Sequence, residues 1–227
     1  MYTAELATRT WTEVGPDGRQ LLAVPLGSLE QHGPHLPLDT DTRIAGALAA
    51  GLAAARPDVM VAPALAYGAS GEHAAFPGTL SIGTEALTTV IVELGRSADR
   101  FAGMVLVNGH GGNVDAVRAA TGLLVDEGRR VLAWSPRADG GDAHAGRTET
   151  SVLLAVDPSA VHLDRAEAGA TAPLEQLIGP LRRGGVIAVA PNGVLGDPTG
   201  ASAAEGAAVL EAMVADLTGA VDRAFPR

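Results

Sequence analysis

The chain alternates between short runs that are apolar throughout and longer runs in which apolar residues recur at helical spacing. Short, continuously apolar runs rich in Val are typical of strands that are buried on both faces of a parallel sheet. The pattern predicts strands at residues 21–26, 59–63, 103–108, 130–134 and 186–190.

Helical spacing is clear in the second of the longer runs, where Leu87, Ile91 and Leu94 fall on one face and Glu85 and Glu93 lie outside it. Helices are predicted at residues 42–55, 84–100, 113–127, 148–156, 173–181 and 203–224. The alternation of strand, loop and helix predicts a single α/β domain over residues 1–227, with a mostly parallel sheet and helices on both of its faces.

Histidines concentrate in the loops that follow the predicted strands. In open α/β sheets, ligands bind at the carboxyl ends of the strands, where these loops lie. The loops span residues 27–40, 64–83, 109–112 and 135–147. Of the six histidines, only His162 falls outside them, and the others are His32, His35, His73, His110 and His144. We therefore expect one functional site built from these loops.

Composition narrows the chemistry of that site. The chain has 16 Lys and Arg against 26 Asp and Glu, a net charge of −10 that argues against a nucleic-acid partner. It contains no Cys, so any metal must be held by His, Asp and Glu. The longest nearly apolar run, Ile44–Ala55, is too short to span a bilayer, and residues 1–20 do not resemble a signal peptide. We expect no membrane association and a cytoplasmic location.

The first loop carries the strongest metal-ligand pattern, with two His and three carboxylates between residues 30 and 41. Oxygen and imidazole donors in such a set suit hard or borderline divalent cations. Turn residues in the loop allow Glu30, His32 and Asp41 to converge, with His35 and Asp39 as supporting residues around them. The alternative is that Asp39, Thr40 or Asp41 only caps the following helix, which explains neither Glu30 nor the histidines.

Two further clusters follow later strands. His110 is surrounded by Gly109, Gly111 and Gly112, which permit a close backbone approach to a ligand, and Asn113 is predicted to cap the next helix. His144 and Glu149 lie where a loop enters a helix, as metal ligands, as general acid or base, or as groups that orient a ligand.

A capping box is the structural alternative for Glu149, and both roles can coexist. His144 is the better candidate for acid–base catalysis, because a neutral imidazole can take and give protons near pH 7. Glu72 and His73 lie in a Gly-rich loop and are candidates for substrate contacts. No serine of the chain sits in a recognisable nucleophile elbow.

With these residues in hand, the sequence resembles the creatininase family. The resemblance is carried by residues 27–37 with Asp41, by residues 108–113 and by residues 144–151. It implies a three-layer α/β/α sandwich, two divalent metal ions per subunit and a homo-oligomer, commonly a hexamer. It also implies metal ligation by Glu30, His32, Asp41 and His110, with Asp41 bridging both ions.

Other stretches resemble a peptide-cleaving branch of this family, namely residues 67–73, 81–87, 144–154 and 193–198. That branch implies cleavage of a modified ribosomal precursor peptide, with release of a C-terminal Val–Tyr-derived unit that is built into a redox cofactor. One departure matters: creatininase proper has a carboxylate ligand at the position of Gly112. The resemblance therefore disfavours creatinine hydrolysis and makes Glu149 or His144 the expected replacement ligand.

These observations support three hypotheses. The first is a metal-dependent amide hydrolase that acts on a peptide. The second keeps the enzyme and changes its substrate to a small cyclic amide or a formamide. The third is a non-catalytic metal-binding scaffold protein. Oxygen and nitrogen ligands without sulfur suit Zn, Mn or Fe(II), and the sequence does not choose among these metals.

Overall fold

The computed structural model describes residues 4–14, 19–136 and 142–227, so part of the predicted loop 135–147 lies outside the described residues. Its sheet has four parallel strands in the order β2-β1-β3-β4. The strands are β1 (Leu21–Leu26), β2 (Val59–Val61), β3 (Gly103–Asn108) and β4 (Val131–Trp134). The four strands predicted nearest to these positions are therefore confirmed.

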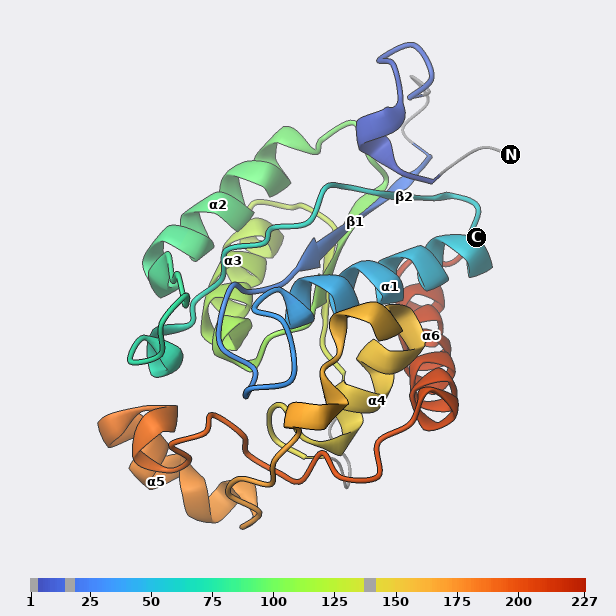
Figure 1. Cartoon of the computed structure of the whole chain (residues 1–227). Coiled ribbons are helices and arrows are strands. Elements are labelled where there is room, and N and C mark those ends of the chain that lie inside the picture. The colour runs from blue at the N-terminus through green and yellow to red at the C-terminus, as the bar shows by residue number, and fades with distance from the viewer. Residues whose placement is uncertain (1–3, 15–18, 137–141) are drawn as a thin grey trace.

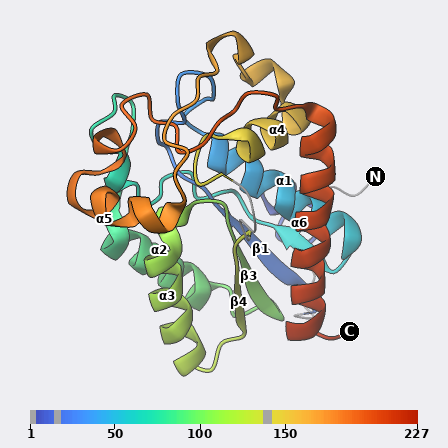
Figure 2. The ribbon, with the colours of Figure 1, turned by 90° about the horizontal axis from the view of Figure 1, so that it is seen from below.

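Helices cover both faces of this sheet. They are α1 (Thr40–Ala55), α2 (Gly83–Ser97), α3 (Val114–Asp126), α4 (Arg147–Val156), α5 (Leu174–Gly184) and α6 (Ala203–Ala224). Helices α2 and α3 lie on one side of the strands, and α1, α4 and α6 lie on the other (Figures 1 and 2). The predicted α/β/α sandwich is confirmed. No helix in the described ranges is long and apolar enough to cross a membrane.

The strands are apolar throughout because each face packs against a helical layer. In β1, Leu21 and Ala23 belong to the core beneath α1 and α6, whereas Leu22, Val24 and Leu26 belong to the core beneath α2 and α3. All five side chains are at most 7 % exposed. Alternate residues therefore serve opposite cores, as the pleat of a strand requires.

The strand predicted at residues 186–190 is wrong. Val186–Ala188 forms a short 3-10 helix, η6, directly after Gly185, whose φ of +69° turns the chain away from α5. Val186 packs with Ala190 and Leu195 in a small apolar cluster outside the sheet. A short apolar run is compatible with either a buried strand or a buried helical turn, so periodicity alone could not decide.

The register of the sheet brings the predicted loops to one edge. Strands β1 and β3 pair along their whole length, and Leu26 lies opposite Asn108 at their carboxyl ends. The loops that carry Glu30 and His110 therefore leave the sheet side by side. Helix α5 lies apart from the two helical layers, at lower left in Figure 1, and packs against this edge through η2 (Gly71–His73) and η6.

A buried arginine ties the ends of two helices together. Arg56 follows α1 and is 1 % exposed. Its guanidinium donates to Asp58 at 2.8 Å and to Asp222 of α6 at 2.5 Å, and it also reaches the carbonyl of Phe225 at 3.3 Å. The contact fixes the end of α1 against the end of α6.

We expect Arg56→Ala to lower the free energy of unfolding by about 2 kcal/mol, because the packed stem and the ion pairs are lost together. Urea unfolding at pH 7 measures this. The hydrogen bond from Arg56 lowers the pKa of Asp58, so that contribution is full above the ordinary Asp pKa and is lost as pH falls through the lowered value. The deficit of the variant should therefore shrink as the pH falls below the ordinary pKa of Asp. The exposed pair Arg118–Asp115 provides a control, since Arg118→Ala should change stability by less than about 0.5 kcal/mol.

Candidate metal centre

Three groups of side chains at the carboxyl edge of the sheet are arranged as metal ligands. In each group the potential ligand atoms lie within 4.8 Å of one another. The groups are Glu30 with Asp41 and His110, His32 with His144 and Glu149, and Glu30 with His73 and His144. Every residue predicted from the sequence as a metal ligand is brought into this cluster: Glu30, His32, Asp41, His110 and Glu149.

Asp41 lies at the middle of the cluster, in the first turn of α1. Its Oδ1 is 3.1 Å from Nε2 of His32, and its Oδ2 is 3.1 Å from Nδ1 of His110. Ser28 also donates to Oδ2, at 2.8 Å. Burial alone would raise the pKa of Asp41, but His32 and His110 together hold it well below the usual range. Asp41 is thus an ionised carboxylate that faces both histidines.

The orientation of His32 follows from its backbone contact. Its Nδ1 lies 3.1 Å from the carbonyl oxygen of Glu30, which only accepts, so Nδ1 carries a proton. A neutral His32 then directs the lone pair of Nε2 toward Asp41 and toward Glu149, whose Oε2 is 3.9 Å away. Burial alone would lower the pKa of His32, yet the facing carboxylates raise it to about 10. The carboxylates around Nε2 of His32 therefore favour a positive charge there, either as a second proton on the ring or as a metal ion.

Glu30 gives the most direct sign of a bound cation. Its side chain is fully buried, and neither carboxylate oxygen accepts a hydrogen bond of good geometry from any described residue. The nearest nitrogens are Nε2 of His110 at 3.1 Å and Nε2 of His73 at 3.3 Å. Burial raises the pKa of Glu30 to about 7. A buried carboxylate without partners is costly, so these residues fit a metal ion as their missing partner.

Gln31 is a site residue that the sequence argument did not single out. Its Oε1 accepts from the backbone N–H of Gly33 at 2.8 Å, and its Nε2 donates to the carbonyl of Gly193 at 3.0 Å. These two backbone contacts fix which end of the amide is which. The same Nε2 lies 2.9 Å from Nδ1 of His73 and 3.0 Å from Nε2 of His144.

The amide and carbonyl groups of Gln31 set the proton positions on both imidazoles. Nε2 of His144 lies 2.9 Å from the backbone oxygen of Gln31 and must donate to it, which leaves the lone pair on Nδ1. The second amide proton of Gln31 then goes to Nδ1 of His73, so Nε2 of His73 carries the proton. Burial keeps both rings neutral, since it lowers the pKa of His73 to about 3 and that of His144 well below its usual value.

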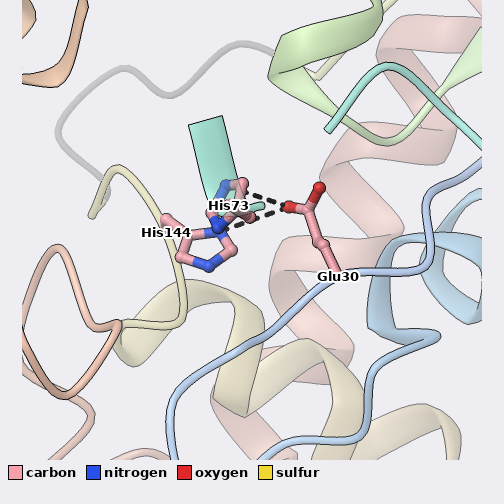
Figure 3. A group of neighbouring side chains, drawn as sticks. All are labelled: Glu30, His73 and His144. Carbon is pink, nitrogen blue, oxygen red and sulfur yellow. Dashed lines mark ion pairs between the residues drawn. The ribbon is translucent and has the colours of Figure 1, made fainter. Parts of the chain in front are cut away.

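These proton positions show which of the histidines beside Glu30 has a free lone pair for a metal. His73 points an N–H at Oε1 of Glu30, 3.3 Å away, whereas His144 points its Nδ1 lone pair at the same oxygen, 3.9 Å away (Figure 3). His73 therefore has no free lone pair for a metal beside Glu30. The other two groups do not include His73.

Glu149 faces His32 and also fixes the start of α4. Its Oε2 lies 3.9 Å from His32 and accepts from the backbone N–H of Ala145 at 2.6 Å. This is not the capping box considered above, because Ala145 precedes the N-cap residue Gly146, which has no side chain. Ala145 has a positive φ of 52°, which is uncommon for a residue with a Cβ and holds the turn between His144 and α4. Burial raises the pKa of Glu149.

The two residues predicted to support the ligands, His35 and Asp39, have different outcomes. His35 is buried, and its Nε2 lies 2.9 Å from the hydroxyl of Thr150, the residue after Glu149. Asp39 is not brought to the cluster. Its carboxylate pairs with Arg43 at 2.7 Å on the surface of α1, and it makes no side-chain capping bond although it precedes that helix.

Asn113 has a different role from the predicted helix cap. Its side chain makes no capping bond to α3. Instead its Oδ1 accepts from the N–H of Ala69 at 2.9 Å, and its Nδ2 donates to the carbonyl of Gly27 at 3.0 Å. It thereby joins the loops after β1, β2 and β3. The sequence held no signal for this contact, because the partners are distant along the chain.

A cavity of about 630 Å³ opens onto the cluster. Asp41, His110, His144 and Glu149 line its inner end. Both predicted substrate contacts, Glu72 and His73, line the cavity, although His73 is only 3 % exposed and faces Glu30. Helix α5 and the segment after it form the outer wall, through Ile178, Leu181, Arg182 and Val186.

A parallel α/β/α sheet with two ligand groups of His and carboxylates beneath an open cavity defines a metal-dependent hydrolase. The Creatininase family model, described as creatinine amidohydrolase, matches residues 7–221. The chain belongs to the creatininase family.

Comparisons with individual proteins agree with this family assignment. The chain is 53 % identical over 234 residues to the mycofactocin precursor peptide peptidase of Mycobacterium tuberculosis (strain CDC 1551 / Oshkosh), covering 98 % of this chain and 92 % of that protein. It is similar to a solved structure titled "Creatininase Mn", with a TM-score of 0.82, 26 % identity and full coverage of both chains. A mutant creatininase of Zn-Zn type gives a TM-score of 0.81, also with 26 % identity and full coverage.

The Gln31 network generates a prediction. Gln31→Glu replaces the amide donor by a carboxylate oxygen, which cannot donate to Gly193 or to His73. We expect amide hydrolysis to fall by about 10–100-fold, as for other groups that orient metal-site histidines, while the metal content is retained. Gln20→Glu, before β1 at the opposite edge of the sheet, is the matched control. Unchanged hydrolysis in the Gln31 variant would contradict the assigned role.

Proposed function

We propose that this chain is a metal-dependent peptidase that cleaves the modified mycofactocin precursor peptide and releases its C-terminal Val–Tyr-derived unit during redox cofactor biosynthesis. The observation that carries the proposal is the pair of ligand groups about Asp41, at the inner end of an open cavity. The substrate is inferred from the relative that is 53 % identical along almost the whole chain.

In this proposal the centre binds two divalent ions per subunit. Glu30, Asp41 and His110 would hold one of them. His32 and Glu149 would hold the other together with Asp41, since carboxylate oxygens of both Asp41 and Glu149 face Nε2 of His32. The donor set suits Fe(II), Zn or Mn. When bound, the ions polarise the scissile carbonyl and lower the pKa of the attacking water.

His144 handles the proton in this mechanism. Its Nε2–H is held by the carbonyl of Gln31, so its free lone pair is on Nδ1, at the inner end of the cavity. His144 is neutral, and it takes the proton of the attacking water at Nδ1 and then delivers it to the leaving amine. His73 lies beside Glu30, with its Nε2 3.3 Å from Oε1, and takes no part in this proton transfer.

The cavity walls support a peptide substrate. Ile178 and Leu181 present apolar surface, and Arg182 places a cation opposite the acidic cluster. The homo-oligomer, a hexamer by resemblance, and the cytoplasmic location stay predictions.

The principal test is mass spectrometry of the modified precursor peptide incubated with the purified protein. We expect cleavage that a chelator abolishes and that re-addition of Fe(II), Zn or Mn restores. Asp41→Asn should reduce cleavage by more than about 100-fold, because both ligand groups lose a shared carboxylate. Asp126→Asn, at the exposed end of α3, is the control and should leave cleavage unchanged.

The outcomes separate the competing functions. An intact peptide at high concentrations of metal-loaded protein would contradict the peptidase. Hydrolysis of a cyclic amide or a formamide instead, in a substrate panel, would support the second hypothesis, in line with the description of the family. Bound metal without any metal-dependent hydrolysis, and an Asp41 variant altered only in assembly, would support the scaffold.

A further inference from the structure

Glu72 lies beside the centre without a role in the mechanism above. It belongs to η2, one residue before His73. Its Oε1 is 3.6 Å from Nε2 of His110, the same nitrogen that lies 3.1 Å from Oε2 of Glu30. The carbonyl of Ala69 and the hydroxyl of Ser70 lie 3.3 and 3.5 Å from this nitrogen. Two carboxylates, from separate loops, therefore converge on one edge of His110.

Gly112 leaves the space that Glu72 occupies. A Cβ on residue 112 would lie 2.4 Å from Oε1 of Glu72, and equally close to Nε2 of His110 and to the carbonyl of Ala69. Real Cβ atoms do not approach other atoms this closely, so a side chain at residue 112 and the Glu72 carboxylate compete for one volume. The space beside residue 112 is thus occupied by a carboxylate from a different loop.

Glu149 and His144, the replacements expected from the sequence, lie with His32 on the other side of Asp41. Glu72 instead faces the group formed by Glu30 and His110. The side chains of Asp41, Glu30 and His110 are almost completely buried, whereas that of Glu72 is 36 % exposed and reaches the group from the cavity.

The backbone of Glu72 is fixed while its carboxylate is free to turn. A Cβ on Gly185, at the end of α5, would lie 2.6 Å from the carbonyl oxygen of Glu72, so the two backbones are in close contact. Within the described ranges, no hydrogen bond holds the carboxylate of Glu72, and its only ion-pair contact is with His110. A carboxylate placed in this way can turn toward a cation in the group.

We propose that Glu72 is a further ligand of the ion held by Glu30, Asp41 and His110. The inference rests on the proposed function only in that the centre binds metal. It assigns Glu72 to the metal rather than to direct recognition of the peptide.

The test is the metal content and zinc affinity of the full-length protein, measured by elemental analysis and by calorimetry with zinc alone. We expect Glu72→Ala and Glu72→Gln to bind one ion about 10–100-fold more weakly, or to lose it. Glu85→Ala, which removes an exposed carboxylate from the first turn of α2, should bind zinc as the unmodified chain does.

Three outcomes would overturn the inference. Full zinc affinity in both Glu72 variants would show that Glu72 is not a ligand. Loss in Glu72→Ala but not in Glu72→Gln would show that it acts by accepting a hydrogen bond from His110. Loss accompanied by a lower melting temperature of the chelated protein would reveal a folding defect instead. Zinc binding that depends on Glu72 in a protein that leaves the peptide intact would overturn the proposed function alone.

Discussion

The carboxylate of Asp41, held between two imidazoles, is the contact on which the rest of the centre depends. It joins α1 to the loops after β1 and β3, because His32 approaches one of its oxygens and His110 the other. Both histidines also face a second carboxylate, Glu149 and Glu30 respectively. The cluster therefore gathers three carboxylates around two histidines in buried surroundings, an arrangement that suits divalent cations.

Hydrogen bonds from residues outside the ligand groups hold this cluster in place. Gln31 fixes the proton position on His73 through its side-chain amide and that on His144 through its backbone carbonyl, and Asn113 joins the loops after three strands to each other. These residues are amides, which can donate and accept at once, so each can satisfy backbone groups of both kinds. The site is built on short loops whose ends are fixed by the register of β1 and β3.

Much of the fold and of the ligand set could be predicted along the chain. Apolar runs located the four strands, and helical spacing located the helices, because both depend on neighbouring residues. Glu30, His32 and Asp41 were predicted together because they share one loop. The strand expected at residues 186–190 failed, since its apolar side chains pack in a small cluster beside α5 rather than in the sheet. The prediction that Asp39 supports the ligands failed, because its carboxylate pairs with Arg43, one helical turn further along α1.

By itself the sequence determined the α/β class, the edge of the sheet that carries the site and the kinds of ligand atom available. Those follow from the periodicity and from the chemistry of each residue type. The tertiary structure alone decided which nitrogen of His144 is free, and that Glu72 fills the space left by Gly112. These outcomes depend on contacts within a few ångströms between loops that are far apart in sequence, and only the folded chain sets such distances.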